Sequence, residues 1–465
     1  MRPVDGAASM TNSRLLLALG LGWVIAMAFY FAFQGLGPFS DEGSFCTIAQ
    51  GILHGRLPYR DYFNEKTPLQ YFWTALVMRF AGDGVEGARA ASTITLALTL
   101  GLLLSRLAKQ PVSLGLMLPW AGAIAVMGLM MKVYNNTAES TLALLFVACA
   151  VMIFGRQWMR PGPQALLVGS IQGLACGFRQ TMVVSAFILL ISPWHRAKRW
   201  WYFAGFLLGM ALWVAMLWSM GILQDALGAT VFFHLNNPSG SSYFRLIDEN
   251  DYAALLIWLL SLGSVFIASS RSREAVWVVA WAIAAATPFF GRMDAFRLWP
   301  SMSLILSYLF IRLSGTASFM GLVSFSVVVA LGSATLHRPD SFWWTTQITE
   351  RIGRYVAENE TIWIGPFEPN AYCLSKRPSA TKYYFILPWM VKPEVREELV
   401  KEITVNRPKL IVDLSNPTYS LKELVPDLDR LIQEKYALVE HHDGAGYFIL
   451  RDAPRRKSTN LPLNP

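Results

Sequence analysis

The sequence is poor in charge. Asp, Glu, Lys and Arg make up 15% of its 465 residues, whereas an ordinary soluble domain has about 25%. Apolar residues reach 54%, which indicates that much of the chain lies in lipid rather than in a series of soluble domains. The net charge of +9 does not indicate nucleic-acid binding, because the basic residues lie between long apolar runs.

Cysteine is also scarce. The four cysteines show no CxxC and no metal-like spacing. Cys149 and Cys176 lie in apolar runs and are predicted to be small core residues. A disulfide between Cys46 and Cys373 is possible but is not the expected state. The chain has no internal repeat, and its part beyond about residue 340 has neither a glycine-rich phosphate loop nor a nucleophile motif.

What the chain does have is long apolar runs. They predict a multi-span α-helical membrane protein with about 11 transmembrane helices, since some 20 apolar residues cross the hydrocarbon core. The predicted spans are 14–33, 87–105, 113–131, 138–155, 164–177, 180–193, 200–220, 252–269, 275–290, 296–312 and 318–336. The first run is too long for a signal-peptide core and is interpreted as a retained helix.

The charges of the connections predict the orientation. Alternate connections carry Lys and Arg, whereas the other connections carry acids such as Asp41 and Asp61. The Lys/Arg bias places the N-terminus in the cytoplasm, and an odd number of spans places the C-terminal part outside. We therefore expect an integral protein of a bacterial inner (plasma) membrane.

The chain changes character near residue 340, where turn and charge signals return. Helical spacing at 348–358 and 394–406 and strand signals at 361–365, 410–414 and 447–450 predict a small C-terminal α/β domain. The predicted domains are 1–338 in the membrane, 339–453 outside it, and a disordered tail at 454–465. Five polar residues of the second domain are expected to form a solvated surface rather than to face the membrane part: Tyr372, Lys376, Arg377, Tyr383 and Tyr384.

The first external loop, residues 34–86, is long, and long loops in compact proteins are usually functional. Its segments 44–53 and 69–80 are predicted to be surface helices. Asp41 and Glu42 follow the first span directly, where a carboxylate could take the proton of an acceptor hydroxyl. The alternative is that Asp41 only caps a helix.

Four charged residues follow between two prolines of the same loop: Arg60, Asp61, Glu65 and Lys66. A phosphate leaving group needs cations, which Arg60 and Lys66 could provide. The alternative for both cations is interfacial snorkelling.

The loop motifs resemble those of the C-type glycosyltransferase superfamily. They are Asp-Glu-Gly at 41–43, Gly-Arg-Leu-Pro-Tyr-Arg-Asp at 55–61 and Glu-Lys-Thr-Pro at 65–68. The resemblance is to the protein O-mannosyltransferase-like family 39 and to the related bacterial lipid A aminoarabinose transferases. It implies a large first external loop with surface helices and a terminal soluble domain outside.

The resemblance also implies roles. Asp41 corresponds to the catalytic base with Glu42 beside it, and Lys66 to the lysine that binds the donor phosphate. Glu65 and His234 correspond to a pair that can bind a divalent metal ion, the one cofactor implied. Phe233 stands where the family usually has an acid, and a glutamate with a histidine makes only half of a zinc site, so both observations count against a metal.

Other polar residues are predicted near the same outer face. Glu139 is interpreted as a second acid of the site or, alternatively, as a carboxylate at the start of a helix. Asp61 and Glu139 are the candidates for the acceptor ligand or second acid. Arg179, Arg292 and Arg297 are candidate phosphate ligands. Convergence of these groups on one face indicates a single site, although an interfacial charge belt would produce the same pattern.

The sequence therefore predicts a membrane glycosyltransferase, a hexosyl- or pentosyltransferase. Its partners would be a polyprenyl-phosphate-sugar donor, membrane lipid and a lipid, glycan or protein acceptor, and no nucleic acid. A polysaccharide polymerase or O-antigen ligase would use similar donors but favours a long loop late in the chain. A transporter would place its polar residues near the bilayer midplane, often in paired repeats.

Overall fold

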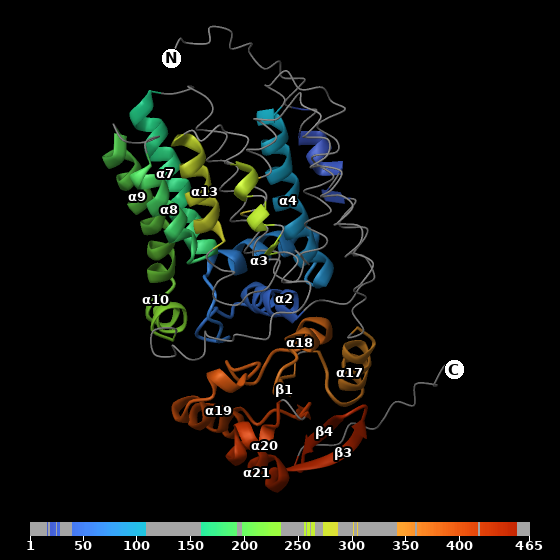
Figure 1. Ribbon diagram of the computed structural model, residues 1–465. Helices are drawn as coiled ribbons and strands as arrows, with labels where there is room; N and C mark the ends of the chain where they lie inside the picture. Colours follow the sequence, from blue (N-terminus) through green and yellow to red (C-terminus); the bar gives the residue numbers. More distant parts are fainter. Residues whose placement is uncertain are drawn as a thin grey trace.

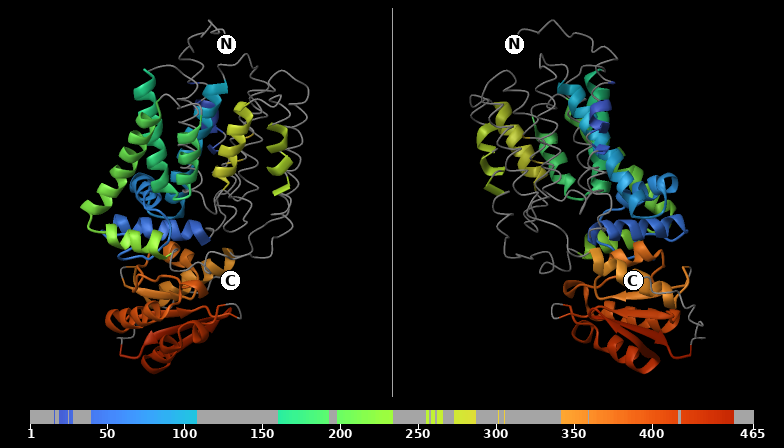
Figure 2. Two further views of the ribbon diagram at one scale, coloured as in Figure 1. Left: turned by 60° about the vertical axis from the view of Figure 1, so that its left-hand side comes forward. Right: turned by 90° about the vertical axis from the view of Figure 1, so that its right-hand side faces the viewer.

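The computed structural model describes residues 40–107, 160–192, 198–233, 273–286 and 342–452 except 359, 417 and 418, with isolated positions within 16–27, 255–265 and 301–305. The described part has three layers (Figures 1 and 2). A helical bundle forms one end, a mixed α/β region (the C-terminal region, residues 342–452) forms the other, and two helices of the first loop lie crosswise between them.

Five helices of the bundle correspond to predicted spans. They are α4 (Val85–Leu107), α7 (Pro161–Phe178), α8 (Met182–Ile191), α9 (Arg199–Ser219) and α13 (Arg273–Ala285). Each differs from its predicted bounds by a few residues. The predicted spans 113–131, 138–155 and 318–336 lie outside the described residues, and 14–33, 252–269 and 296–312 are described only in part.

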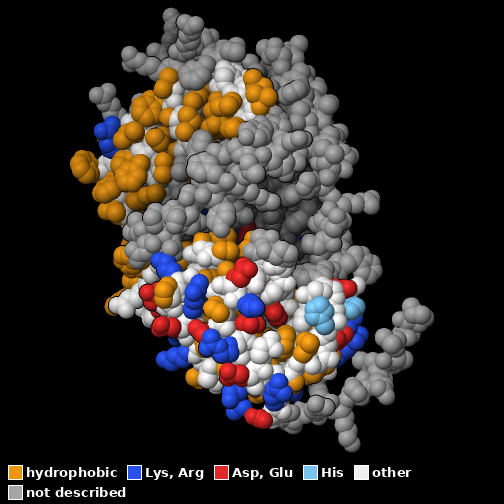
Figure 3. Space-filling model, turned by 60° about the horizontal axis from the view of Figure 1, so that its bottom comes forward, with side chains coloured by type: hydrophobic (Ala, Val, Ile, Leu, Met, Phe, Trp, Pro, Cys, Tyr) orange, Lys and Arg blue, Asp and Glu red, His pale blue; other side chains and the backbone are white. Residues whose placement is uncertain are grey.

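One helix among those described, α9, is long and apolar enough to cross a membrane. Its tryptophans Trp200, Trp201 and Trp218 are exposed near its two ends, the positions where aromatic side chains meet the two membrane–water interfaces. Figure 3 shows apolar side chains gathered over the bundle and mixed charges spread over the C-terminal region.

Glycines bring α7 and α9 into backbone contact. A Cβ added at Gly169 would lie 2.0 Å from the Tyr202 carbonyl oxygen, and one at Gly205 would lie 2.0 Å from that of Leu166. Gly173 and Gly209 repeat the pattern one turn further along each helix, so both helices carry the Gly-x-x-x-Gly spacing typical of helix pairs in membranes. After α9 come the short α10 (Leu223–Leu227) and a π-helical turn, η3 (Gly228–Phe232).

The first loop contributes α2 (Ser40–Leu53) and α3 (Leu69–Ala81). Helix α3 exposes Leu76 and Phe80, which suits a surface helix. Helix α2 differs from the prediction in two ways: it begins at Ser40, and the residues from Glu42 to Gly51 are all buried. The reason is that α2 packs against α3 and also against α18 (Pro369–Ser375) of the C-terminal region.

The C-terminal region contains a four-stranded sheet in the order β1-β2-β4-β3. Strands β1 (Ile362–Gly365) and β2 (Leu410–Asp413) are parallel, and β4 (Ala445–Leu450) pairs antiparallel with β2 and with β3 (Tyr436–His442). The helices are α17 (Phe342–Tyr355), α18 (Pro369–Ser375), α19 (Pro393–Asn406), α20 (Leu421–Leu424) and α21 (Pro426–Lys435), with a 3-10 turn, η5 (Pro388–Met390).

This region agrees with the predicted α/β character, although β3, α18, α20 and α21 are additional elements. The predicted boundary at 338/339 and the predicted tail 454–465 lie outside the described residues. One apolar cluster spans the first loop and the C-terminal region, since Phe45, Tyr59 and Tyr62 share a core with Tyr372 and Tyr384. The two parts therefore fold against each other as one packed unit.

Candidate active site

Helix α2 begins with the acidic pair at the end of the bundle that faces the C-terminal region. Asp41 forms an ion pair with Lys66, with 3.3 Å between Oδ1 and Nζ. The two side chains are 27% and 16% exposed, so the pair is shielded yet still reachable. Asp41 lies within the first helical turn, where the helix dipole favours a carboxylate. The structure thus brings together the two residues that the sequence assigns to proton removal and phosphate binding.

Lys66 is held from several directions. Its ammonium lies 4.8 Å from the centre of the Phe45 ring, a cation–π contact. Its backbone N–H donates to Asn64 Oδ1 over 3.2 Å, and its carbonyl oxygen accepts from the Tyr59 hydroxyl over 2.7 Å. An ammonium group has three N–H donors, so a lysine can contact more than one anion at a time.

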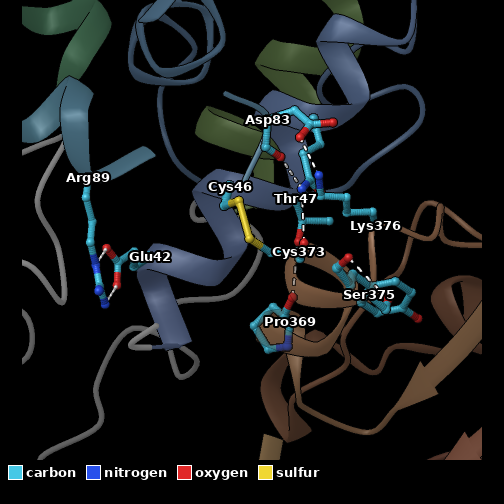
Figure 4. The surroundings of a disulfide bond; sticks show 11 residues. Glu42, Cys46, Thr47, Asp83, Arg89, Pro369, Cys373, Ser375 and Lys376 are labelled. Carbon is cyan, nitrogen blue, oxygen red and sulfur yellow. Dashed lines mark hydrogen bonds and ion pairs between the residues drawn. A yellow bond between two sulfur atoms is a disulfide. The ribbon is translucent and has the colours of Figure 1, made fainter. Parts of the chain in front are cut away.

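Glu42, the neighbour of Asp41 in the sequence, pairs with Arg89 of α4 (Figure 4). The guanidinium donates to both carboxylate oxygens, over 2.8 Å and 3.1 Å, and both side chains are almost completely buried. A second carboxylate, Glu86, lies 3.8 Å from Arg89 Nη1 and is half exposed. Glu42 is therefore bound within the protein and fastens the first turn of α2 to α4.

Arg60 and Asp61 form an exposed pair on the loop, with 3.3 Å between Nη2 and Oδ2. Asp61 Oδ2 also accepts from the Leu57 backbone N–H over 2.6 Å, so this carboxylate stabilises the tight turn at 57–61. The structure gives these two residues local partners within the loop.

Arg179 lies at the end of α7 and is buried, and its backbone N–H donates to the Ala175 carbonyl oxygen over 2.9 Å. The same helix end contacts the start of α3, because a Cβ at Gly177 would lie 2.6 Å from Leu69 Cδ1. Arg179 is therefore at the level of the loop that carries Lys66.

Within the described part of the chain, no three His, Cys, Asp or Glu side chains come together as a metal site. The expected metal pair of Glu65 and His234 is only half within the described part of the chain, because Glu65 is described and His234 is not. Glu139, His234, Arg292 and Arg297 lie outside the described residues. Phe233 packs on Phe63 with 5.3 Å between ring centres, so the end of η3 meets the loop near Glu65.

A disulfide joins Cys46 of α2 to Cys373 of α18, with 5.7 Å between the Cα atoms (Figure 4). The expectation of an unpaired state for these two cysteines is wrong. The pairing has no local signal, because the two residues are 327 positions apart and meet only when the C-terminal region docks. Around it, Thr47 donates to the Pro369 carbonyl oxygen and Lys376 pairs with Asp83 over 2.6 Å.

The expected solvated surface of the C-terminal region is also wrong for most of its residues. Tyr372, Tyr383, Tyr384 and Arg377 are buried. The first loop covers two of them, since Phe63 packs on Tyr383 and Tyr62 packs on Tyr384. The Arg377 guanidinium donates to the carbonyl oxygens of Val356 and Ser375. Lys376 is about half exposed, and it makes the ion pair with Asp83 of the first loop.

Comparison with known proteins agrees with this architecture. No family model and no curated protein matches the sequence. The structure of ArnT from Cupriavidus metallidurans bound to undecaprenyl phosphate matches with a TM-score of 0.55 and 13% identity, over 94% of this chain and 98% of that chain. The apo ArnT structure matches with a TM-score of 0.53 over the same shares of the two chains. The chain shares the fold of these structures, which confirms the C-type glycosyltransferase fold that the resemblance implies.

Sequence reasoning missed several residues around the ion pair. Arg89 carries a usable signal, because an arginine in a predicted span needs a buried counter-charge. Ser44, Asn64 and Tyr384 carry none, since ordinary polar residues become informative only when their partners are known. They form a hydrogen-bonded group that is connected to Lys66 through Asn64 and to the helix of Asp41 through Ser44.

Proposed function

We propose that the protein is a membrane glycosyltransferase that moves a sugar from a polyprenyl-phosphate donor to a lipid, glycan or protein acceptor. The observation that carries the proposal is the partly shielded ion pair between Asp41 and Lys66, 3.3 Å apart at the end of the bundle. The fold shared with C-type glycosyltransferases supports it.

In this proposal Asp41 is the general base. The acceptor oxygen forms a bond to the anomeric carbon of the sugar, and its proton passes to the Asp41 carboxylate. The bond from that carbon to the phosphate oxygen breaks, and the electron pair leaves with the polyprenyl phosphate. Lys66 binds this phosphate and stabilises the charge that develops on it, with Arg179 as a further cation at the same level.

Glu42 supports the site through its partner. Because Glu42 is bound by Arg89, it holds the first turn of α2 in place and leaves Asp41 as the carboxylate next to Lys66. Arg60 and Asp61 are assigned to shaping the loop rather than to the donor, since they contact each other and the turn backbone. Glu139, Arg292 and Arg297 remain proposed ligands of the acceptor or the phosphate.

We place the reaction on the extracytoplasmic face of a bacterial inner membrane. Disulfides persist in oxidising compartments, and the Cys46–Cys373 bond joins two segments that the Lys/Arg bias puts outside. The ArnT structure that shares the fold was solved with undecaprenyl phosphate, which supports a polyprenyl phosphate as the donor carrier.

The test has two parts. Mass spectrometry of lipid and glycan fractions from a deletion strain should show a missing sugar decoration, which identifies donor and acceptor together. The purified protein should then release free polyprenyl phosphate from that donor. A transporter would leave the sugar–phosphate bond intact, and a polymerase or ligase would transfer a whole glycan chain.

The variant Asp41→Asn should lower the transfer rate by about 10²–10⁴-fold, the usual contribution of a general base. The matched control is Asp225→Asn, which changes an exposed aspartate of α10 in the same way. Unchanged transfer by the Asp41 variant would show that the base is another residue.

A further inference from the structure

Three buried polar groups meet where the C-terminal region touches the first loop. The Tyr384 hydroxyl is hydrogen-bonded to the Ser44 hydroxyl, and the Asn64 side-chain amide donates to both of these oxygens, over 3.0 Å each. All three side chains are buried, and Tyr384 is fully so. Buried hydrogen bonds of this kind select one geometry, because any other leaves a polar group unsatisfied.

This group connects directly to both members of the candidate site. Ser44 lies one turn after Asp41 on α2. Asn64 Oδ1 accepts the Lys66 backbone N–H over 3.2 Å, which fixes the amide so that its NH₂ faces the two hydroxyls. Tyr384 therefore reaches the helix of Asp41 through Ser44 and the backbone of Lys66 through Asn64.

We propose that Tyr384 is a positioning residue of the transferase site, which rests on the function proposed above. From the C-terminal region, its hydroxyl holds Asp41 and Lys66 at the separation that the transfer needs. The C-terminal region is then an integral part of the active site and not a separate attachment. The disulfide on α2, just beyond Ser44, fastens the same two parts together.

The chemistry of the phenol fits this role. Burial raises the pKa of Tyr384 well above its ordinary value of 10.0, although the hydrogen bonds to Ser44 and Asn64 act in the opposite direction. The hydroxyl stays neutral in the physiological range, where it can both donate and accept a hydrogen bond. Its ring also packs edge-on against Tyr62 at 5.7 Å, so the loop holds the ring in place independently of the hydroxyl.

The test is Tyr384→Phe, which removes one oxygen atom and keeps the ring. The matched control is Tyr372→Phe, since Tyr372 is also fully buried in the same region but bonds to the Ile364 backbone instead of the loop. We expect Tyr384→Phe to lower kcat by at least about tenfold, because displacement of reacting groups by about 1 Å can cost 10²-fold. The control should keep kcat within about twofold even if both variants lose similar thermal stability.

Two further measurements make the outcomes decisive. Native mass spectrometry measures the binding of undecaprenyl phosphate alone. This binding should be weaker in Tyr384→Phe, because Lys66 is displaced in that variant, and it should be unchanged in Tyr372→Phe. In a background that carries both Ser44→Ala and Asn64→Ala, Tyr384→Phe should have less than about a twofold further effect, since both routes from its hydroxyl are already lost.

Equal kcat in the two tyrosine variants would overturn the positioning role while leaving the transferase function standing. Absence of transfer by the wild-type protein, together with the binding difference, would overturn the proposed function and leave the effect of Tyr384 on Lys66 intact.

Discussion

The guanidinium of Arg89 contacts both oxygens of the Glu42 carboxylate, and both side chains are removed from water. The charge of Glu42 is thus neutralised by α4, whereas its neighbour Asp41 contacts Lys66 of the loop. Two adjacent carboxylates have different partners, because successive residues of a helix point in different directions.

The variant Arg89→Met should be strongly destabilised. It leaves the Glu42 carboxylate buried without its main counter-charge, a change that typically costs about 3–5 kcal/mol. Thermal unfolding in detergent is the measurement. The double variant Glu42→Gln with Arg89→Met removes both charges and should regain much of the loss. A single variant that melts like the wild-type protein would contradict the structural role of the pair.

Replacing Cys46 and Cys373 by Ser should lower stability, by an amount on the order of 2–4 kcal/mol for a typical disulfide. The bond joins α2 to α18, so protease cleavage between the bundle and the C-terminal region should become faster. Cys176→Ser is the control, because that buried cysteine is free. A peptide containing both cysteines should appear in non-reduced digests, and its absence under oxidising purification would refute the pairing.

The glycine contacts of α7 and α9 should not tolerate a methyl group. Gly205→Ala forces a Cβ to within 2.0 Å of a backbone oxygen, so the helices must separate, at a cost of about 1–3 kcal/mol. Gly228→Ala adds the same methyl group where nothing lies within 4 Å, and it should be neutral or stabilising. Melting temperatures of the two variants check this, and equal losses would argue against close packing.

Asp413 at the end of β2 should make the C-terminal region less stable at neutral pH. Burial raises its pKa above the ordinary 3.8, although the Ser415 N–H and hydroxyl act in the opposite direction. For an acid with a raised folded pKa, stability is complete below the unfolded pKa and declines as the pH rises through the folded one. The penalty therefore develops above about pH 3.8 and persists at pH 7.

The variant Asp413→Asn keeps an acceptor for both Ser415 donors and carries no charge. It should raise the melting temperature relative to the wild-type protein at pH 7, and the difference should vanish toward pH 3.8. A difference that does not change with pH would show that ionisation of Asp413 is not its cause.

Local patterns predicted much of the architecture. The apolar runs locate α4, α7, α8, α9 and α13 within a few residues, because a helix that faces lipid or other helices must be apolar over its own length. Strand β3 was not predicted, because its sequence lacks a regular pattern of this kind. It is at the edge of the sheet and leaves Leu438 and Val439 exposed, so its sequence lacks the alternation of a half-buried strand.

The sequence by itself determined the helical membrane plan, the acidic start of the first loop and the choice of Asp41 and Lys66, since these follow from composition, spacing and recognisable motifs. Only the tertiary structure decided which side chains form pairs. It paired Glu42 with Arg89, Cys46 with Cys373, and Tyr384 with Ser44 and Asn64. Such pairings join segments far apart in the chain, and their energy depends on burial and distance, which no local pattern encodes.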